Sequence, residues 1–247
     1  MNNILKIVYT PTNDSYRLAI VSMYSLLKNN DKNIVDFYIV IDNIFDKNNC
    51  KDFFQLKQFK NCRNIQFVNT LFEFDNYFRS KVYVTERMRI YQLSKIIHED
   101  RVLMIDAQTI VNDDLLELYN IDLDGCACAA TEYIQSKDII RMNNIENKKI
   151  VYNSGVILID LKVWDEKNYL DKIHSKALLK NRKKMYEIAV FNIVVDSCKL
   201  LDFKYNYMES YYPNGEINCS FSTCTIYKKF FMHIDMPVII TDRKSVV

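Results

Sequence analysis

The chain opens with short apolar runs separated by segments whose apolar residues recur at helical spacing. The runs at residues 4–9, 36–41 and 65–68 are rich in Ile, Val, Phe and Tyr, and each has the length of a buried strand. Between the first two runs, apolar residues three and four positions apart predict a helix that ends at Asn29 and Asn30. Strands that alternate with helices pair in parallel through right-handed crossovers, so the pattern predicts an α/β fold.

The same alternation continues through the rest of the chain. Ile90, Leu93 and Ile97 share one face of a predicted helix, which leads into a strand at residues 102–105 that stops at Asp106. The other elements that we predict are strands at 126–130 and 156–159 and helices at 50–59, 161–181 and 186–195. Because no linker or internal repeat interrupts them, we predict a single domain.

Composition and charge exclude several classes of protein. With 247 residues, of which 49% are hydrophobic, the chain is long enough for one domain with a sizeable core. Its 33 Lys and Arg nearly balance 31 Asp and Glu, and no like-charge block indicates a nucleic-acid partner. Since we find neither a signal peptide nor a run of membrane-spanning length, we expect a cytoplasmic protein with no transmembrane segment.

Glycine and cysteine usage excludes two kinds of nucleotide site and a disulfide framework. Only three glycines occur, which is too few for a dinucleotide-binding Rossmann turn or a phosphate-binding P-loop. The seven cysteines are odd in number and scattered, so we interpret them as reduced thiols. Cys126 and Cys128 are expected on one face of a buried strand, as small apolar residues rather than metal ligands.

Three polar motifs lie at the ends of predicted strands: two follow a strand and the third precedes one. Open α/β sheets bind ligands in such a region. The motifs are Thr12-Asn13-Asp14-Ser15-Tyr16, Asp106-Ala107-Gln108 and Asn153-Ser154-Gly155, the last followed by an apolar strand and Trp164. Taken singly, each has an ordinary structural interpretation: a turn with a helix cap, an Asp that ends a strand, and a turn into a core strand.

In this order, the motifs resemble those of glycosyltransferase family 8. The resemblance implies a single α/β domain of the nucleotide-diphospho-sugar transferase (GT-A) type, with a mixed, mostly parallel sheet flanked by helices. It also implies a metal-dependent, retaining hexosyltransferase. Its donor would be a nucleotide-sugar, expected to be a UDP-sugar, and its acceptor a hydroxyl of a glycan that is free, lipid-linked or protein-linked.

The resemblance also assigns roles to individual residues. Asp106 and Gln108 would hold Mn²⁺ or Mg²⁺, because hard oxygen ligands suit these ions. Asn153, Ser154 and Glu187 would act at the reacting sugar. The nucleotide-sugar would contact Thr10, Thr12, Asn13, Tyr16, Arg89, Asp106 and Ala107. The alternative interpretation of Arg89 is an exposed helix arginine that contacts solvent and no ligand. The position of ligand sites in such sheets predicts that Asp106, Asn153 and Tyr16 share one cleft.

The chain departs from the family pattern at several positions. Gln108 replaces the second acid of an Asp-x-Asp pair, and Ile188 and Ala189 replace a polar pair that lies against the sugar. The C-terminal His motif is matched either at His233 without its Gly and Lys or at Thr241 without its His. We therefore keep a second hypothesis, a catalytically impaired protein that binds a nucleotide or a partner.

The last residues suggest that the family domain is incomplete. Residues 242–247 resemble the translation of a sequencing adapter, so we assign residues 1–241 to the domain and expect a non-native tail after it.

Overall fold

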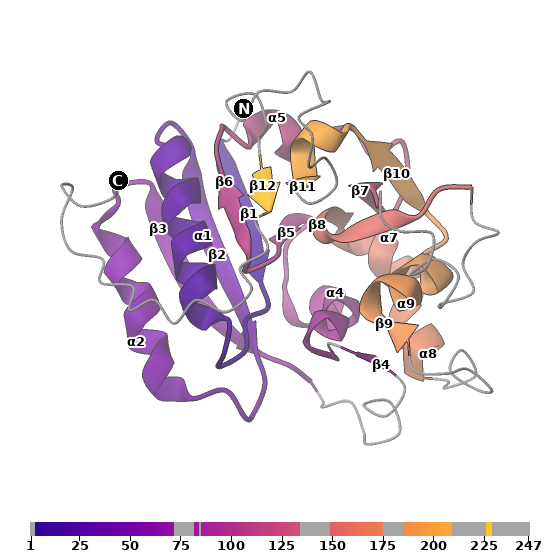
Figure 1. Cartoon of the computed structure of the whole chain (residues 1–247), viewed down its shortest axis with the longest axis horizontal. Coiled ribbons are helices and arrows are strands. Elements are labelled where there is room, and N and C mark those ends of the chain that lie inside the picture. The colour runs from indigo at the N-terminus through magenta and orange to yellow at the C-terminus, as the bar shows by residue number, and fades with distance from the viewer. Residues whose placement is uncertain are drawn as a thin grey trace.

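A mixed sheet forms the centre of the protein. The computed structural model describes residues 3–71, 82–83, 85–133, 149–174, 185–208 and 226–228. Within them, seven strands form the main sheet in the order β10-β7-β8-β5-β1-β2-β3 (Figure 1). Their bounds are β1 (Ile4–Tyr9), β2 (Ile34–Ile41), β3 (Cys62–Asn69), β5 (Arg101–Ile105), β7 (Cys128–Glu132), β8 (Tyr152–Asp160) and β10 (Cys198–Leu201). Neighbouring strands pair in parallel except at β8, which is antiparallel to β5 and β7, so the predicted mixed, mostly parallel sheet is confirmed.

Helices and two small sheets surround the main sheet. The α-helices are α1 (Tyr16–Asn29), α2 (Cys50–Phe53), α4 (Leu93–Ile96), α5 (Leu116–Tyr119), α7 (Leu161–Glu166), α8 (Tyr169–His174) and α9 (Glu187–Val194). The 3-10 helices are η1 (Lys47–Asn49), η2 (Phe54–Gln58), η3 (Thr85–Gln92) and η5 (Phe203–Asn206). One small sheet joins β4 (Val82–Tyr83) to β9 (Met185–Tyr186), and the other joins β11 (Tyr207–Met208), β12 (Ile226–Lys228) and β6 (Thr109–Val111).

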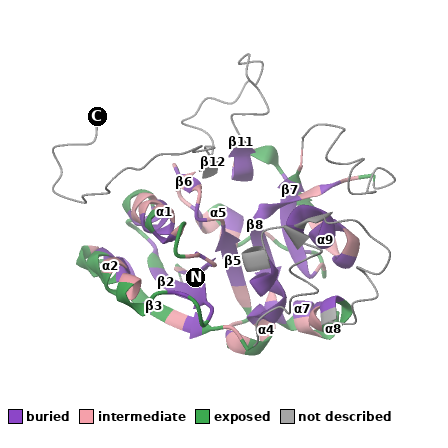
Figure 2. Ribbon diagram, turned by 60° about the horizontal axis from the view of Figure 1, so that its bottom comes forward, coloured by how far each residue is buried: buried purple, intermediate pink, exposed green. Residues whose placement is uncertain are grey.

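Apolar side chains fill both faces of the sheet. In β1, Ile7 packs in one cluster with Met23 of α1, whereas the next residue, Val8, packs in the other with Trp164 of α7 and Phe191 of α9. Successive strand residues point to opposite faces, which explains why β2 is buried along almost its whole length. Figure 2 shows this arrangement as buried central strands with exposed residues on the outer helices.

Three predicted boundaries were wrong. The helix predicted at 161–181 is broken between α7 and α8, where Asn168 adopts a left-handed conformation with φ of 53°; residues 175–181 lie outside the described part. β7 starts at Cys128, so Cys126 precedes the strand that we expected it to share. β8 starts at Tyr152, so Asn153, Ser154 and Gly155 belong to the strand instead of a preceding turn.

A charged cluster ties the amino-terminal ends of the central strands together. Lys6 of β1 lies 3.1 Å from the Asp36 carboxylate and donates to Glu99 at 2.7 Å, and Arg63 Nε donates to Asp36 at 2.9 Å. Burial disfavours the charged form of Asp36, but hydrogen bonds from Arg63 and Lys6 outweigh it and lower the pKa of this carboxyl. Asp36 is therefore ionised in the folded protein.

We predict that Asp36→Asn lowers the free energy of unfolding by about 2 kcal/mol at neutral pH, because two charge-assisted hydrogen bonds weaken. Since the pKa of Asp36 is lower in the folded state, its stabilising effect is full above the ordinary pKa of about 3.9 and is lost as the pH falls through the folded value. Denaturant titrations at pH 7 and in acid measure this. The exposed Asp31→Asn serves as control; equal losses for the two variants would contradict a stabilising role for the cluster.

Candidate functional site

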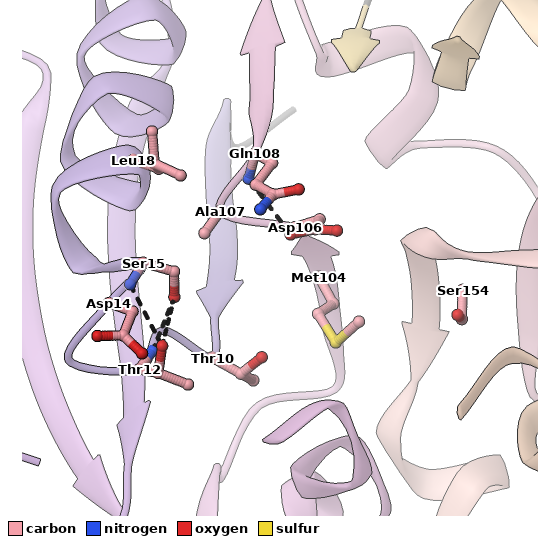
Figure 3. Close-up of a pocket in the computed structure, with 10 residues that line it drawn as sticks. All are labelled: Thr10, Thr12, Asp14, Ser15, Leu18, Met104, Asp106, Ala107, Gln108 and Ser154. Atoms are coloured by element: carbon pink, nitrogen blue, oxygen red, sulfur yellow. Dashed lines mark hydrogen bonds between the residues drawn. The ribbon is translucent and has the colours of Figure 1, made fainter. Parts of the chain in front are cut away.

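A cavity of about 290 Å³ lies where β1 and β5 end (Figure 3). The sheet extends in opposite directions from these two adjacent strands. On one side, β1 is followed by α1 and then by its neighbour β2, and on the other side β5 pairs with β8. Such a divergence is where open α/β sheets bind ligands. The cavity is lined by Thr10, Thr12, Asp14, Ser15, Leu18, Met104, Asp106, Ala107, Gln108 and Ser154.

The reversed strand β8 brings the third polar motif to this edge of the sheet. Because β8 is antiparallel to β5, its first residues lie beside the end of β5, and Asp106 N donates to Gly155 O at 2.8 Å. Ser154 therefore lies on the cavity wall, across from the Thr12 loop in Figure 3. Three motifs that are distant in sequence meet around one cavity.

Buried hydroxyl groups fix the turn that carries Asp106. Tyr9 OH bonds to Ser22 Oγ at 2.7 Å, Ser22 Oγ to Thr109 Oγ1 at 2.8 Å, and Thr109 Oγ1 donates to Asp106 O at 2.8 Å. Burial raises the pKa of Tyr9, so its hydroxyl stays protonated. This chain links the turn after β5 to β1 and α1, and thereby holds the Asp106 backbone against the first strand.

The Thr12 loop is held by its own hydroxyls. Thr12 N donates to Ser15 Oγ at 2.9 Å, and Ser15 N donates to Thr12 Oγ1 at 3.2 Å. These bonds set the start of α1 against the cavity, where the partial positive charge of a helix N-terminus favours anions. No Lys or Arg of the described residues lines the cavity, so the helix terminus is the positive feature of the described wall.

Asp106 and Gln108 present oxygen atoms at the cavity. One carboxylate oxygen of Asp106 accepts a hydrogen bond from Gln108 N at 3.2 Å, which closes a tight turn and places both side chains side by side (Figure 3). A carboxylate and a carboxamide are hard oxygen donors that suit Mg²⁺ or Mn²⁺. The described residues contain no group of three or more His, Cys, Asp or Glu that could hold an ion, so these two side chains would supply at most part of a ligand shell.

Asn13 and Tyr16 lie next to the cavity without lining it. Asn13 bonds to the loop after β2, since its Nδ2 donates to Ile44 O at 3.0 Å and its Oδ1 accepts from Asp46 N at 2.8 Å. The Tyr16 ring is 7% exposed and packs on Phe45 and Phe53, with centroids 6.4 and 6.3 Å away. Of the three residues predicted to share one cleft, Asp106 lines the cavity, Asn153 is buried beside Ser154, and Tyr16 packs in the core.

Arg89 is buried beneath the loops, not solvated. Its guanidinium pairs with Asp42, and the two side chains are 5% and 7% exposed. Its Nη1 donates to Pro11 O at 2.9 Å and to Val40 O at 3.3 Å. Arg89 thus connects the loop after β1 to the end of β2, which sets the position of the Thr12 loop.

Asn153, Ser154 and Glu187 are buried around the start of β8. Asn153 Oδ1 accepts from Gly155 N at 2.8 Å. Glu187, in the first turn of α9, is 7% exposed and lines a small recess next to the main cavity together with Ser154.

Four residues that line the cavity had no predicted role. Asp14 and Ser15 stand within the first motif, whereas Leu18 and Met104 read as helix and strand residues of the core. Leu18 and Met104 fit the apolar periodicity of α1 and β5, so the sequence marks them only as core residues. Their place on the cavity wall follows only from the position of the cavity. The C-terminal residues that we compared with the family's His motif lie outside the described residues.

The chain is similar to known glycosyltransferases. The family model of glycosyl transferase family 8 matches residues 6–235. The lipopolysaccharide 1,2-glucosyltransferase of Escherichia coli K12 is 28% identical over 199 residues, which are 75% of this chain and 57% of that protein. Glycosyltransferase GlyF of Streptococcus pneumoniae is 28% identical over 117 residues, 47% of this chain and 27% of GlyF. The chain therefore matches little more than half of the length of the glucosyltransferase and about a quarter of the length of GlyF.

Solved structures of glycosyltransferases share the fold. Galactosyltransferase LgtC in complex with donor and acceptor sugar analogs gives a TM-score of 0.67 at 16% identity, over 91% of this chain and 86% of LgtC. GlyE of Streptococcus pneumoniae TIGR4 gives 0.61 at 18% identity, over 97% of this chain and 57% of GlyE. The predicted GT-A fold is confirmed. Within the described residues, no helix is long and apolar enough to cross a membrane.

We predict that Arg89→Ala lowers the free energy of unfolding by about 3–5 kcal/mol, because it leaves the buried Asp42 carboxylate and two backbone carbonyls without their donor. Arg17→Ala, which removes an exposed arginine from α1, should cost less than about 1 kcal/mol. Chemical denaturation of both variants measures the difference. Wild-type stability in Arg89→Ala would contradict a role for Arg89 in holding these loops.

Proposed function

Because the chain belongs to glycosyl transferase family 8, we propose that it transfers a hexosyl group from a nucleotide-sugar to a glycan hydroxyl. In this reaction the bond between sugar C1 and the diphosphate oxygen breaks, and the acceptor oxygen bonds to C1 with the original anomeric configuration. The acceptor loses its proton, and the nucleoside diphosphate leaves. The acceptor is a glycan, either free or carried by a lipid or protein.

One observation carries the proposal: the Thr12 loop, the Asp106 turn and Ser154 surround a single cavity at the carboxyl edge of the sheet. A nucleotide-sugar needs an anion site between a base site and a sugar site. The start of α1 offers the anion site. The Thr12 loop lies to one side of this helix start, and Ser154 lies to the other. We therefore place the uridine toward Thr10 and Thr12, and the hexose toward Ser154.

The structure suggests different kinds of contribution for the remaining predicted residues. We assign Asp106, Ala107 and Gln108 to the diphosphate side of the donor, because they line the cavity. Asn13, Tyr16 and Arg89 support the donor loops, since their contacts run to the β2 loop, to the core and to Asp42. Asn153 and Glu187 border the sugar side from within the protein.

Asp106 and Gln108 would hold Mn²⁺ or Mg²⁺ through oxygen atoms. The bound ion would neutralise charge on the leaving diphosphate. Gln108 contributes an oxygen without a charge, and ligand charge sets affinity for hard cations, so we expect this chain to bind the ion weakly.

A nucleotide-binding module without transfer activity is the alternative. The residues that replace the family's polar pair favour it, since Ile188 is 6% exposed, Ala189 is fully buried, and neither offers a polar group to a sugar. Isothermal titration of UDP with and without Mn²⁺, followed by a UDP-hexose turnover assay, tests both functions. Metal-dependent binding with turnover supports the transferase, and binding without turnover supports the module. No UDP binding under either condition contradicts both.

We predict that Gln108→Asp tightens Mn²⁺-dependent UDP binding by about 1 kcal/mol or more, because the second carboxylate adds a charge-assisted contact to the ion. Asp106→Asn should remove the metal dependence. Isothermal titration of each variant with UDP at saturating Mn²⁺ measures the change.

The control is Gln58→Asp, which makes the same substitution at an exposed position that does not line the cavity. Equal affinities for Gln108→Asp and Gln58→Asp would place the metal away from the Asp106 turn.

A further inference from the structure

Two cysteines lie opposite each other on the neighbouring strands β7 and β10. Cys128 is the first residue of β7, Cys198 is the first residue of β10, and the register of this parallel pair makes them partners. Side chains at one level of a parallel pair point to the same face of the sheet, so both thiols lie on one face. The packing agrees, since Cys128 belongs to the core cluster that contains Trp164, and Cys198 packs against that cluster.

The two thiols are close enough to react with each other. Cys128 Sγ donates at 3.7 Å to the carbonyl oxygen of Ser197, the residue directly before Cys198, and the Cys198 thiol is a side-chain hydrogen-bond neighbour of Cys128. In-register residues of adjacent strands have Cα atoms about 4.8 Å apart, and a disulfide needs a separation of about 4.4–6.8 Å. A bond between the two sulfur atoms therefore fits the backbone as it stands.

Strand β8 holds both cysteines in this arrangement. Cys128 pairs on its other side with Ile159 of β8, and Tyr152 OH, also from β8, donates to Cys198 O at 2.8 Å. Both backbones are thus fixed by bonds that do not involve the thiols. The sheet keeps the two thiols side by side.

The two cysteines differ in their access to solvent. Within the described residues, β10 is an edge strand of the main sheet, and Cys198 is half-buried there. Cys128 is fully buried, and burial together with the neighbouring Cys198 thiol raises the pKa of Cys128, so this thiol stays protonated. Because the thiolate is the nucleophile, Cys198 is the thiol that reacts first with a reagent from solution.

We propose that Cys128 and Cys198 are a redox-sensitive pair, which closes to a reversible disulfide when the protein meets a low-molecular-weight disulfide such as oxidised glutathione. The Cys198 thiolate attacks one reagent sulfur, the reagent S–S bond breaks, and the first reagent thiol leaves. The Cys128 sulfur then attacks the Cys198 sulfur, and its proton goes to the second reagent thiolate as that group leaves. Two protein thiols are oxidised, and one reagent disulfide is reduced to two thiols.

The bridge would enclose the part of the chain that borders the cavity. Asn153, Ser154 and Glu187 all lie between the two cysteines in the sequence. A disulfide there would restrain the segment that carries them. The pair itself does not depend on the proposed function.

Peptide mapping of the folded wild-type protein tests the proposal. The protein is incubated with oxidised glutathione, free thiols are alkylated, and tryptic peptides are analysed by mass spectrometry without reduction. We expect a cross-link between the tryptic peptides 102–137 and 185–199, which dithiothreitol should remove. Glutathione retained on Cys198 without a cross-link overturns the proposal, and so does alkylation of both Cys128 and Cys198.

Two alanine variants identify the partner of Cys198, because peptide 102–137 also contains Cys126. Cys126→Ala changes a residue that precedes β7 and should leave the cross-link intact. Cys128→Ala should abolish the cross-link and leave glutathione on Cys198. Loss of the cross-link in Cys126→Ala overturns the proposal, and this result is sufficient if Cys128→Ala fails to fold. UDP binding has no part in the experiment, so its outcome is separate from that of the proposed function.

Discussion

The antiparallel pairing of β8 with β5 is the constraint on which the site depends. A parallel strand at this position would send Asn153 and Ser154 to the opposite edge of the sheet. Reversal places them beside Asp106, and the hydrogen bond from Asp106 N to Gly155 O continues the ladder beyond the end of β5. The same pairing creates the wall that separates the main cavity from the recess behind Ser154.

Buried polar contacts, more than apolar packing, set the positions of the loops around the cavity. The hydroxyl chain from Tyr9 through Ser22 and Thr109 fixes the turn after β5. Arg89, which pairs with Asp42, holds the loop after β1 by donating to Pro11 O. Hydrogen bonds have preferred distances and directions, so they specify loop geometry in a way that apolar contacts do not. Rigid loops suit a site that must hold the two halves of a large ligand in register.

The electrostatics of the described wall are moderate. Asp14 and Asp106 are its acids, no described Lys or Arg faces it, and α1 contributes a helix terminus. A diphosphate would meet little permanent positive charge on this wall, which gives a bound divalent ion a large share of the neutralisation in the proposed reaction. Gln108 has a carboxamide where the family has a carboxylate, and this replacement is therefore expected to weaken donor binding.

The sequence by itself determined the α/β class, the order of the main elements and the motifs at the strand ends. Strand and helix periodicities are local, and the resemblance to family 8 rests on short motifs, so both are readable without coordinates. Element boundaries were less accurate, because Asn153, Ser154 and Gly155 look like turn residues until the pairing of β8 with β5 and β7 is known.

Only the tertiary structure decided which motif residues meet. Tyr16 and Arg89 are residue types that often contact ligands, yet here they contact other parts of the protein. Tyr16 packs on Phe45 of the loop after β2 and on Phe53 of α2, and Arg89 pairs with Asp42, which directly follows β2. Leu18, Met104 and Tyr91 follow apolar periodicity, yet the first two border the cavity and Tyr91 faces the recess. Whether a side chain faces ligand or core depends on elements far away in sequence, and a local pattern carries no information about them.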